Sequence, residues 1–190
     1  MRLLFTLILI STWFTGNTSG PSTELFDHEV CTAKGKCFDL SALRKNRATV
    51  IVFLQPDCPI AQKYTLTLRE MVDTLALSNI DVIGIVPGRY YSRKELKKFA
   101  KKYKLNFPIY FDYTSALAKH MKAEVSPEAF LVDSSATVLY SGKIDNWFEA
   151  LGVHRSVITK FYLKDAISSF LSGTEIAIKK TKAIGCFLEY

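Results

Sequence analysis

The chain has 190 residues, of which 48% are apolar and 13% aromatic, so it is long enough to bury one hydrophobic core. Its formal net charge at pH 7 is +7, and much of that charge lies in residues 94–104, where lysines surround an apolar stripe at helical spacing. This pattern is typical of the solvated face of a surface helix, so we expect no nucleic-acid partner.

Residues 1–20 are predicted to be a signal peptide. Arg2 precedes an apolar run, residues 3–10, that is too short to span a membrane. Small residues follow, but Pro21 disfavours a cut directly before it, so the cleavage site stays open. We therefore expect an exported protein, periplasmic or extracellular, that is not an integral membrane protein and forms one domain over residues 21–190.

All four cysteines lie in the expected mature chain, and an oxidising compartment permits disulfides. Cys31 and Cys37 flank residues 32–36, which resemble a hairpin turn with Gly35 supplying the unusual backbone angle. Cysteines that face one another across a hairpin can reach disulfide distance. We predict a structural Cys31–Cys37 disulfide, which leaves Cys58 and Cys186.

The first half of the mature chain is predicted to form a βαβ unit. Short strands are expected within residues 24–40 and a brief helical or loop segment at 41–46. A nearly continuous β-branched and apolar run at 49–55 predicts a central strand, followed by a helix at 58–77 and a strand at 80–86. This order implies two parallel strands joined by a right-handed crossover.

The second half switches towards antiparallel pairing. A capping box formed by Ser92 and Glu95 opens the lysine-rich helix. The elements expected after it are a strand at 108–111, a helix at 114–122, a hairpin of strands at 129–132 and 138–141, and a closing helix at 159–171. The tail, 174–190, could add an edge strand. The order predicts an α/β fold, a central mixed β-sheet flanked by helices on both faces.

Cys58 lies where the first central strand ends and the following helix begins. The positive end of the helix dipole and the free N–H groups of the first turn favour a thiolate there, the form that acts as nucleophile or metal ligand. Asp57 opposes this effect, and Pro59 suits the first helical turn. From position alone, a structural disulfide stays open as the alternative role of Cys58.

Four segments together resemble exported thioredoxin-like redoxin-domain proteins of the thioredoxin/peroxiredoxin superfamily: FLQPDCPIAQKY (53–64), VSPEAFLVD (125–133), YSGKIDN (140–146) and TKAIGC (181–186). The similarity extends over residues 24–186. It implies a thioredoxin-like fold and thiol-dependent oxidoreductase activity.

The resemblance makes Cys58 the redox-active thiol. Thioredoxins carry Cys-x-x-Cys after the first central strand, but Ala61 stands at the second cysteine position here. A single thiolate can still attack a disulfide or peroxide, and another group must then resolve the product. Cys186 could do so if the tail folds back over the helix start, and Gly185 would permit a tight approach. A static Cys58–Cys186 disulfide or a buried Cys186 thiol stay open as alternatives.

Pro127 matches the cis-proline loop that faces the active cysteine in thioredoxin-like folds. In the family this loop pairs main chain to main chain with a substrate peptide, which makes Ser126 and Pro127 the expected substrate-binding residues. The alternative for Pro127 is a turn proline before the strand at 129–132.

Two related chemistries lack their usual residues. Peroxiredoxins carry Pro-x-x-x-Thr-x-x-Cys, whereas Gln55 stands three positions before Cys58. Thioredoxin-like copper chaperones carry Cys-x-x-x-Cys and a distant histidine, whereas Gln62 stands four positions after Cys58. His120 is a lone helical histidine, and His28 and His154 have no partners at ligand spacing. We therefore expect no metal and no cofactor.

The sequence is best interpreted as an exported thiol–disulfide oxidoreductase that uses Cys58, with Cys186 as the candidate resolving cysteine. Its expected substrates are protein thiols or disulfides, or peroxide, with an external thiol as electron donor. The alternatives are a non-catalytic thioredoxin-like binding module with structural disulfides, and a thiol peroxidase.

Overall fold

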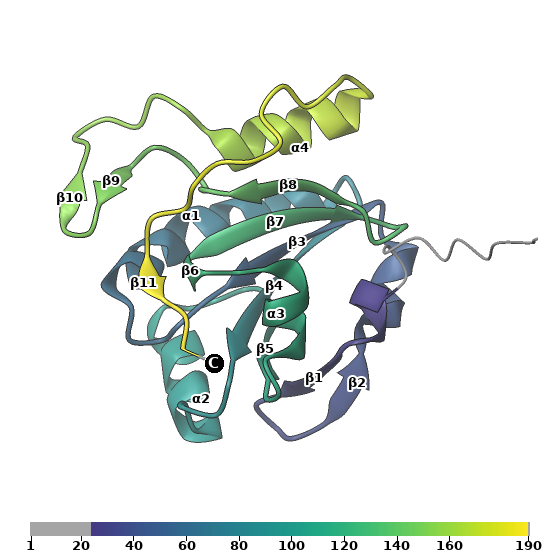
Figure 1. The fold of residues 1–190 in the computed structure, drawn as a ribbon, viewed down its shortest axis with the longest axis vertical. Coiled ribbons are helices and arrows are strands. Elements are labelled where there is room, and N and C mark those ends of the chain that lie inside the picture. The colour runs from purple at the N-terminus through teal and green to yellow at the C-terminus, as the bar shows by residue number, and fades with distance from the viewer. Residues whose placement is uncertain (1–23, 190) are drawn as a thin grey trace, which may run out of the picture.

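The computed structural model of the protein describes residues 24–189 (Figure 1). The predicted signal peptide, residues 1–20, lies outside the described residues. The strands of the main sheet are β1 (Glu29–Thr32), β2 (Cys37–Asp39), β3 (Ala48–Phe53), β4 (Ile80–Pro87), β5 (Ile109–Asp112), β7 (Glu128–Asp133) and β8 (Val138–Gly142). Two small strand pairs stand apart, β6 (Val125–Ser126) with β11 (Cys186–Phe187), and β9 (Phe148–Ala150) with β10 (Val153–His154).

The main sheet has the order β2-β1-β5-β4-β3-β7-β8. Its centre is parallel, because β3 pairs with β4 and β4 with β5 in the same direction, whereas β1, β2, β7 and β8 pair antiparallel. Every residue of β3 is buried, which explains why its sequence is apolar and β-branched on both faces. The predicted βαβ unit and antiparallel hairpin are both present.

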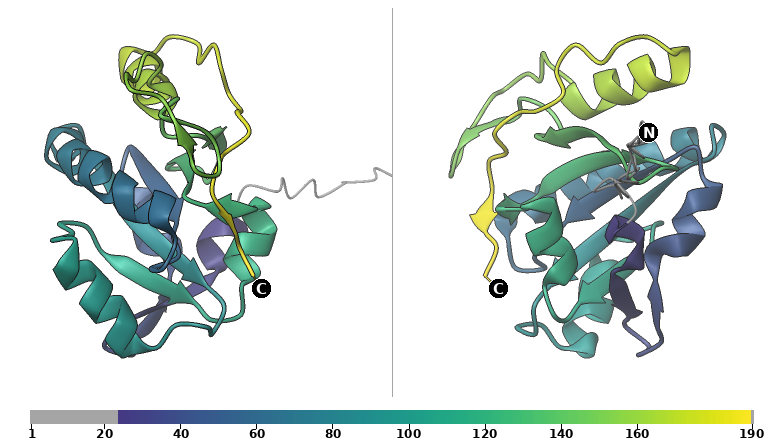
Figure 2. Two further views of the ribbon diagram at one scale, coloured as in Figure 1. Left: turned by 90° about the vertical axis from the view of Figure 1, so that its left-hand side faces the viewer. Right: turned by 45° about the vertical axis from the view of Figure 1, so that its right-hand side comes forward.

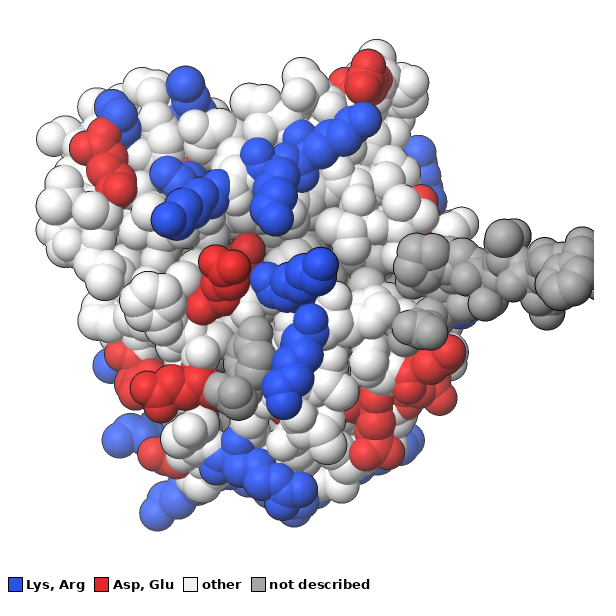
Figure 3. Space-filling model, viewed as in Figure 1, with Lys and Arg blue, Asp and Glu red and all other residues white. Residues whose placement is uncertain are grey.

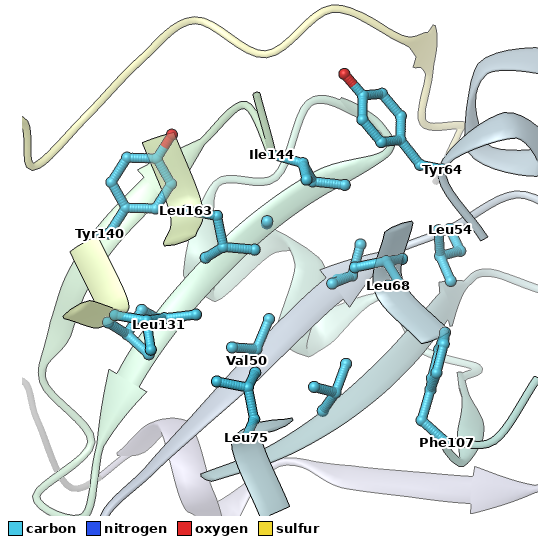
Figure 4. Packing of buried hydrophobic residues seen from close by; sticks show 14 of the residues in the cluster. Val50, Leu54, Tyr64, Leu68, Leu75, Phe107, Leu131, Tyr140, Ile144 and Leu163 are labelled. Atoms are coloured by element: carbon cyan, nitrogen blue, oxygen red, sulfur yellow. The ribbon is translucent and has the colours of Figure 1, made fainter. Parts of the chain in front are cut away.

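Helices cover both faces of this sheet (Figure 2). They are α1 (Pro59–Ala76), α2 (Arg93–Lys102), α3 (Ala116–Met121) and α4 (Tyr162–Ser172), with two 3₁₀ segments, η1 (Glu24–Asp27) and η2 (Leu40–Lys45). α1 and α4 pack on one face, where Leu68 and Leu163 meet Val50 and Leu131 (Figure 4). α3, η1 and η2 pack on the other face. The predicted α/β, thioredoxin-like fold class is confirmed.

Some element boundaries differ from the sequence predictions for identifiable reasons. Residues 24–27 form a 3₁₀ turn rather than a strand, because consecutive Leu25 and Phe26 are both buried, which the alternating faces of a half-buried strand do not allow. The closing helix begins at Tyr162 rather than at 159, because the N–H groups of Thr159 and Lys160 both donate to Oδ1 of Asn146. The β9–β10 pair was not predicted.

Residues 174–189 run from the end of α4 back across β8 to the start of α1 (Figure 1). Ser141 on β8 donates its N–H to the carbonyl of Lys179, over 3.0 Å, and its carbonyl accepts the N–H of Thr181, over 2.9 Å. The segment then forms β11, which pairs antiparallel with β6. The tail thus adds to two strand edges in succession.

The positive charge is spread over a mixed surface. On the face seen in Figure 3, acidic side chains lie beside the basic ones. α2 has the predicted capping box and buries Leu96 and Phe99. Among residues 24–189, no helix is both long and apolar enough to cross a membrane.

Candidate active site at the start of α1

Cys58 is the N-cap residue of α1. After β3 the chain turns, the N–H of Cys58 donates to the carbonyl of Gln55 over 3.1 Å, and Pro59 occupies the first helical position. The carbonyl of Cys58 accepts the N–H of Gln62, over 2.9 Å, as the first bond of the helix. This geometry holds the sulfur beside the positive end of α1, an environment that favours a thiolate when the sulfur is reduced.

The peptide bond between Ser126 and Pro127 is cis, and this loop faces Cys58. The carbonyl oxygen of Ser126 lies 3.0 Å from Sγ of Cys58. Ser126 Oγ accepts the N–H of Gln55 over 2.7 Å, which ties the loop to the turn that precedes Cys58. The buried cis-proline loop and the start of α1 therefore form one hydrogen-bonded unit.

Cys186 reaches this unit from the C-terminal tail and is disulfide-bonded to Cys58, with a Cα–Cα distance of 6.0 Å. In the antiparallel register of β11 and β6, Cys186 lies opposite Ser126 and Phe187 opposite Val125. The carbonyl of Glu124 accepts the N–H of Leu188 over 2.9 Å. The tail therefore approaches Cys58 as an extended strand paired main chain to main chain with the cis-proline loop.

Gly185 makes this approach possible. A Cβ atom at this position would lie 2.1 Å from the carbonyl oxygen of Ser126 and 3.1 Å from the nitrogen of Pro127. Any other residue would require the strand or the loop to move, because real Cβ contacts are not that short. The absence of a side chain is thus a condition for bringing Cys186 to Cys58.

The structure brings together Cys58, Cys186, Ser126 and Pro127, and holds Cys31 and Cys37 apart from them. Cys31 and Cys37 face each other on β1 and β2 and are disulfide-bonded. In the sheet order, β5 and β4 lie between this hairpin and β3. Cys31 is buried against α2 and β5, so this disulfide belongs to the packing of the sheet edge.

A cavity of about 640 Å³ opens beside the Cys58–Cys186 pair. Its walls include the carboxylates of Asp57, Glu95 and Glu189, and no lysine or arginine from residues 24–189 lines it. Tyr91 donates its hydroxyl to Oδ1 of Asp57, over 2.5 Å. Burial, this hydrogen bond and the negative charge of all three carboxylates raise the pKa of Tyr91, so its hydroxyl stays protonated.

Asp145 follows β8, in a position where an aspartate is typical of a turn, but here it is part of a buried hydrogen-bonded pair. Its side chain is buried. Its Oδ1 accepts one hydrogen bond from the hydroxyl of Tyr64, over 2.5 Å, and another from the N–H of Trp147, over 2.7 Å. Burial raises the pKa of Asp145, whereas these two hydrogen bonds act in the opposite direction. Tyr64 and Asp145 line one small cavity together with Pro127, so the pair lies beside the cis-proline loop. In the sequence, the available signal for this buried pair was the hydroxyl group of Tyr64, which lies within the apolar stripe of α1.

Glu128 organises the residues that precede Pro127. Its Oε2 accepts the N–H of Glu124 over 2.8 Å and that of Val125 over 3.4 Å. Burial raises the pKa of Glu128, while these N–H donors and Lys180 favour the charged form. The carboxylate thus holds the turn that leads into β6.

No alternative metal site forms around Cys58 in the part of the chain that the structure describes. Among residues 24–189, one set of potential ligand atoms lies within 4.8 Å of one another, on Glu29, Cys31 and Cys37, and both of its sulfurs belong to a disulfide. The histidine rings pack against other rings: His28 lies edge-on to His120, at 4.9 Å, and His154 stacks on Trp147.

The sequence pattern of the AhpC/TSA family matches residues 21–141. Comparison with curated proteins gives no match. Among solved structures, a hypothetical protein from Sinorhizobium meliloti 1021 is 22% identical, with a TM-score of 0.75, over 85% of this chain and 90% of its own. A secreted Mycobacterium tuberculosis disulfide oxidoreductase homologous to E. coli DsbE is 17% identical, with a TM-score of 0.57, over 80% and 98%. Xylella fastidiosa PrxQ is 18% identical, with a TM-score of 0.54, over 63% and 79%.

Proposed function

The chain belongs to the AhpC/TSA family of redoxin-type thiol oxidoreductases and peroxidases, and we propose that it is a thiol–disulfide oxidoreductase in which Cys58 is the redox-active thiol and Cys186 the resolving cysteine. One observation carries this proposal. The Cys58–Cys186 disulfide lies at the N-terminus of α1 and against the cis peptide bond of Ser126 and Pro127. Cys186, which lies 128 positions after Cys58, thereby supplies the second cysteine that thioredoxins carry at the position of Ala61.

The proposed exchange has two steps. In the reduced protein, the Cys58 thiolate attacks one sulfur of a substrate disulfide, and the other sulfur leaves as a thiolate that takes a proton from water. The Cys186 thiolate then attacks Sγ of Cys58, the Cys58–Cys186 bond forms, and the substrate leaves as its second thiol. Two electrons pass from the protein dithiol to the substrate disulfide, and an external thiol restores the dithiol by the same exchange in reverse.

Peroxide is the second candidate substrate, because the family includes peroxidases. The Cys58 thiolate would attack one peroxide oxygen, the O–O bond would break, and the other oxygen would leave as water or an alcohol, which makes Cys58 a sulfenic acid. The Cys186 thiol would then condense with this sulfenic acid to form the disulfide and release water. Gln55 stands where peroxiredoxins place their threonine, and in the described part of the chain no arginine lines the cavity beside Cys58. These two absences favour disulfide over peroxide as the substrate.

Graded reduction followed by thiol mapping with mass spectrometry tests the proposal. We expect Cys58–Cys186 to open in mild reductant while Cys31–Cys37 persists, with a reduction potential above about −300 mV, the level below which structural disulfides typically lie. A Cys58–Cys186 pair that opens only on unfolding would instead indicate a binding module with structural disulfides. Cys58-dependent consumption of peroxide would favour the second candidate.

We also propose that the protein is exported, with residues 1–20 as a signal peptide and residues 21–190 as the functional domain. Support comes from the charged and apolar pattern of the first residues and from a disulfide that spans the β1–β2 hairpin. N-terminal sequencing of the protein recovered from an exporting host tests this, and a first residue still at Met1 would contradict it.

A further inference from the structure

Three carboxylates of the cavity at the candidate active site come together from three separate segments. Asp57 precedes α1, Glu95 lies in the first turn of α2, and Glu189 belongs to the C-terminal tail. The negative charge of all three acts on the hydroxyl of Tyr91, which lines the same cavity. All three acidic side chains are exposed to solvent. The wall around the active-site disulfide is therefore negatively charged at neutral pH.

Basic side chains near this wall are directed elsewhere. The guanidinium of Arg89 lies over the ring of Tyr113, and Nε of Arg93 donates to the hydroxyl of Tyr113 over 3.4 Å. Lys98 favours the charged form of Glu95 but lies outside the cavity lining. Among residues 24–189, neither of the two ion pairs involves a carboxylate of this cavity. The negative charge of the wall is thus left for another molecule to meet.

Two exposed aromatic rings also line this cavity. The side chain of Tyr90 is 66% exposed and that of Phe187 is 76% exposed. The faces of aromatic rings attract cations, as carboxylates do. The volume of the cavity, about 640 Å³, lies within the range of small-molecule sites. A small cation in this cavity therefore meets ring faces as well as carboxylates.

The disulfide itself completes the acidic wall. Cys186 is held at Cys58, and Glu189 follows Cys186 by three positions. The carbonyl of Glu189 lies 3.4 Å from the position that a Cβ atom on Gly88 would take, so the tail ends against the turn after β4. Once the disulfide opens, this bond no longer holds Glu189 in place. The wall is thus complete in the oxidised protein, which is the state that a reducing thiol meets, whereas the substrate disulfide meets the reduced protein.

We propose that the electron donor of this protein is a small thiol with a positive charge close to its sulfur, and that Asp57, Glu95 and Glu189 select it. The inference rests on the proposed function and deepens it by naming the class of the donor. Opposite charges attract and like charges repel at this range, so the cavity concentrates a cationic thiol beside the disulfide and disfavours an anionic one.

The donor supplies two electrons in two exchanges. Its thiolate attacks Sγ of Cys58, which lines the cavity, and the bond to Cys186 breaks. Cys186 leaves as a thiolate that takes a proton from water. A second donor thiolate then attacks the donor sulfur of the mixed disulfide. Cys58 leaves as a thiolate, and the two donor molecules leave as their own disulfide.

The test compares the rates at which three small thiols of different charge reduce the oxidised full-length protein. Cysteamine is cationic, mercaptoethanol is neutral and mercaptoethanesulfonate is anionic. Each thiol is also reacted with the uncharged disulfide of mercaptoethanol, and its rate with the protein is divided by this reference rate. The quotient, called the corrected rate, removes differences in thiolate fraction and nucleophilicity. Quenched alkylation with mass spectrometry measures the opening of Cys58–Cys186.

We expect the corrected rate of cysteamine to exceed that of mercaptoethanesulfonate by about tenfold or more at low ionic strength, with mercaptoethanol between them. Near 1 M salt, where the Debye length is about 3 Å, this ratio should fall towards one. Glu95→Gln combined with Glu189→Gln should lower the ratio to about threefold or less, and glutamine preserves the capping box with Ser92. Glu70→Gln combined with Glu175→Gln is the matched control, because it removes the same charge at exposed positions outside the cavity lining.

A ratio near one at low ionic strength would overturn the inference, and so would a ratio that both double variants leave at the wild-type value. If none of the thiols opens Cys58–Cys186 before the protein unfolds, the proposed function fails instead, so the two failures are distinguishable. If the Glu95 and Glu189 double variant does not fold, the salt dependence of the wild-type protein decides. A preference for cysteamine that persists unchanged at 1 M salt would contradict selection by these carboxylates.

Discussion

The hydroxyl of Tyr64 donates to Oδ1 of Asp145 over 2.5 Å, and the same carboxylate accepts the N–H of Trp147. Tyr64 belongs to the buried side of α1, six residues after Cys58, and Asp145 follows β8. Tyr64 also lines the small cavity beside Pro127. The pair thus joins the helix that begins at the candidate active site to the chain segment beside the cis-proline loop.

Replacing Tyr64 with phenylalanine should destabilise the protein by roughly 1–3 kcal/mol. The ring keeps its packing against Trp147, but a buried carboxylate loses one of its two donors. Chemical denaturation measures the loss. The double change Tyr64→Phe with Asp145→Ala is the control, because an effect through this bond should be non-additive, whereas independent effects would add.

Asp145 should make stability fall as pH rises. Burial raises its folded-state pKa, so the folded protein binds its proton at pH values where the unfolded chain has released it. This loss of stability is absent below the unfolded-state pKa of about 3.9, and it grows with pH until the pH exceeds the folded-state pKa. Asp145→Asn keeps an acceptor and removes the titration. The free energy of unfolding of the wild type, minus that of the variant, should therefore decrease from acid to neutral pH. Denaturation across that pH range measures this difference. A difference independent of pH would contradict the raised pKa.

Glu128 should act through its acceptor oxygen rather than its charge. Glu128→Ala leaves the N–H groups of Glu124 and Val125 without this partner, which we expect to destabilise the protein by about 1–3 kcal/mol and to loosen the entry into β6. Glu128→Gln retains an acceptor and serves as the matched control. Hydrogen exchange at the amide of Val125 distinguishes the two. Equal protection in the alanine and glutamine variants would show that the hydrogen bonds do not hold this turn.

The parts of the site that are local in sequence were predictable. The apolar run of β3, the turn and Pro59 together place Cys58 at a helix start, because each of these signals acts within a few residues. Likewise, the short loop between Cys31 and Cys37 limits how those residues can meet. The fold class followed from the order of such local elements.

The long-range parts were less accessible. β6 and β11 have two residues each, too few for any periodic pattern, and their pairing joins Ser126 to Cys186 across the chain. The sequence therefore left open whether Cys186 reaches Cys58. Asp145 resembled a turn residue because its burial depends on Tyr64, which lies 81 positions earlier. Such roles arise from tertiary packing and have no local signal.

Gly185→Ala should slow closure of the Cys58–Cys186 disulfide. The added Cβ conflicts with the carbonyl of Ser126, so β11 cannot pair with β6 in the same register. We expect the rate of disulfide formation after reduction to fall at least about tenfold, measured by quenched alkylation and mass spectrometry. Gly152→Ala is the control, because a Cβ added there would meet no atom within 4 Å and its φ of +77° confines the cost to local backbone strain. Equal slowing in both variants would point to general destabilisation.

Removing the Cys31–Cys37 disulfide should lower stability without changing the reactivity of Cys58. The bond closes a short loop, for which chain entropy predicts a loss of roughly 2 kcal/mol when both residues are replaced by alanine. β5 and β4 separate this hairpin from β3, so the geometry at Cys58 should persist. Denaturation measures the first effect, and the rate at which a small thiol reduces Cys58–Cys186 measures the second. A change of more than about threefold in that rate, under conditions where the variant is folded, would show that the two disulfides are coupled through the sheet.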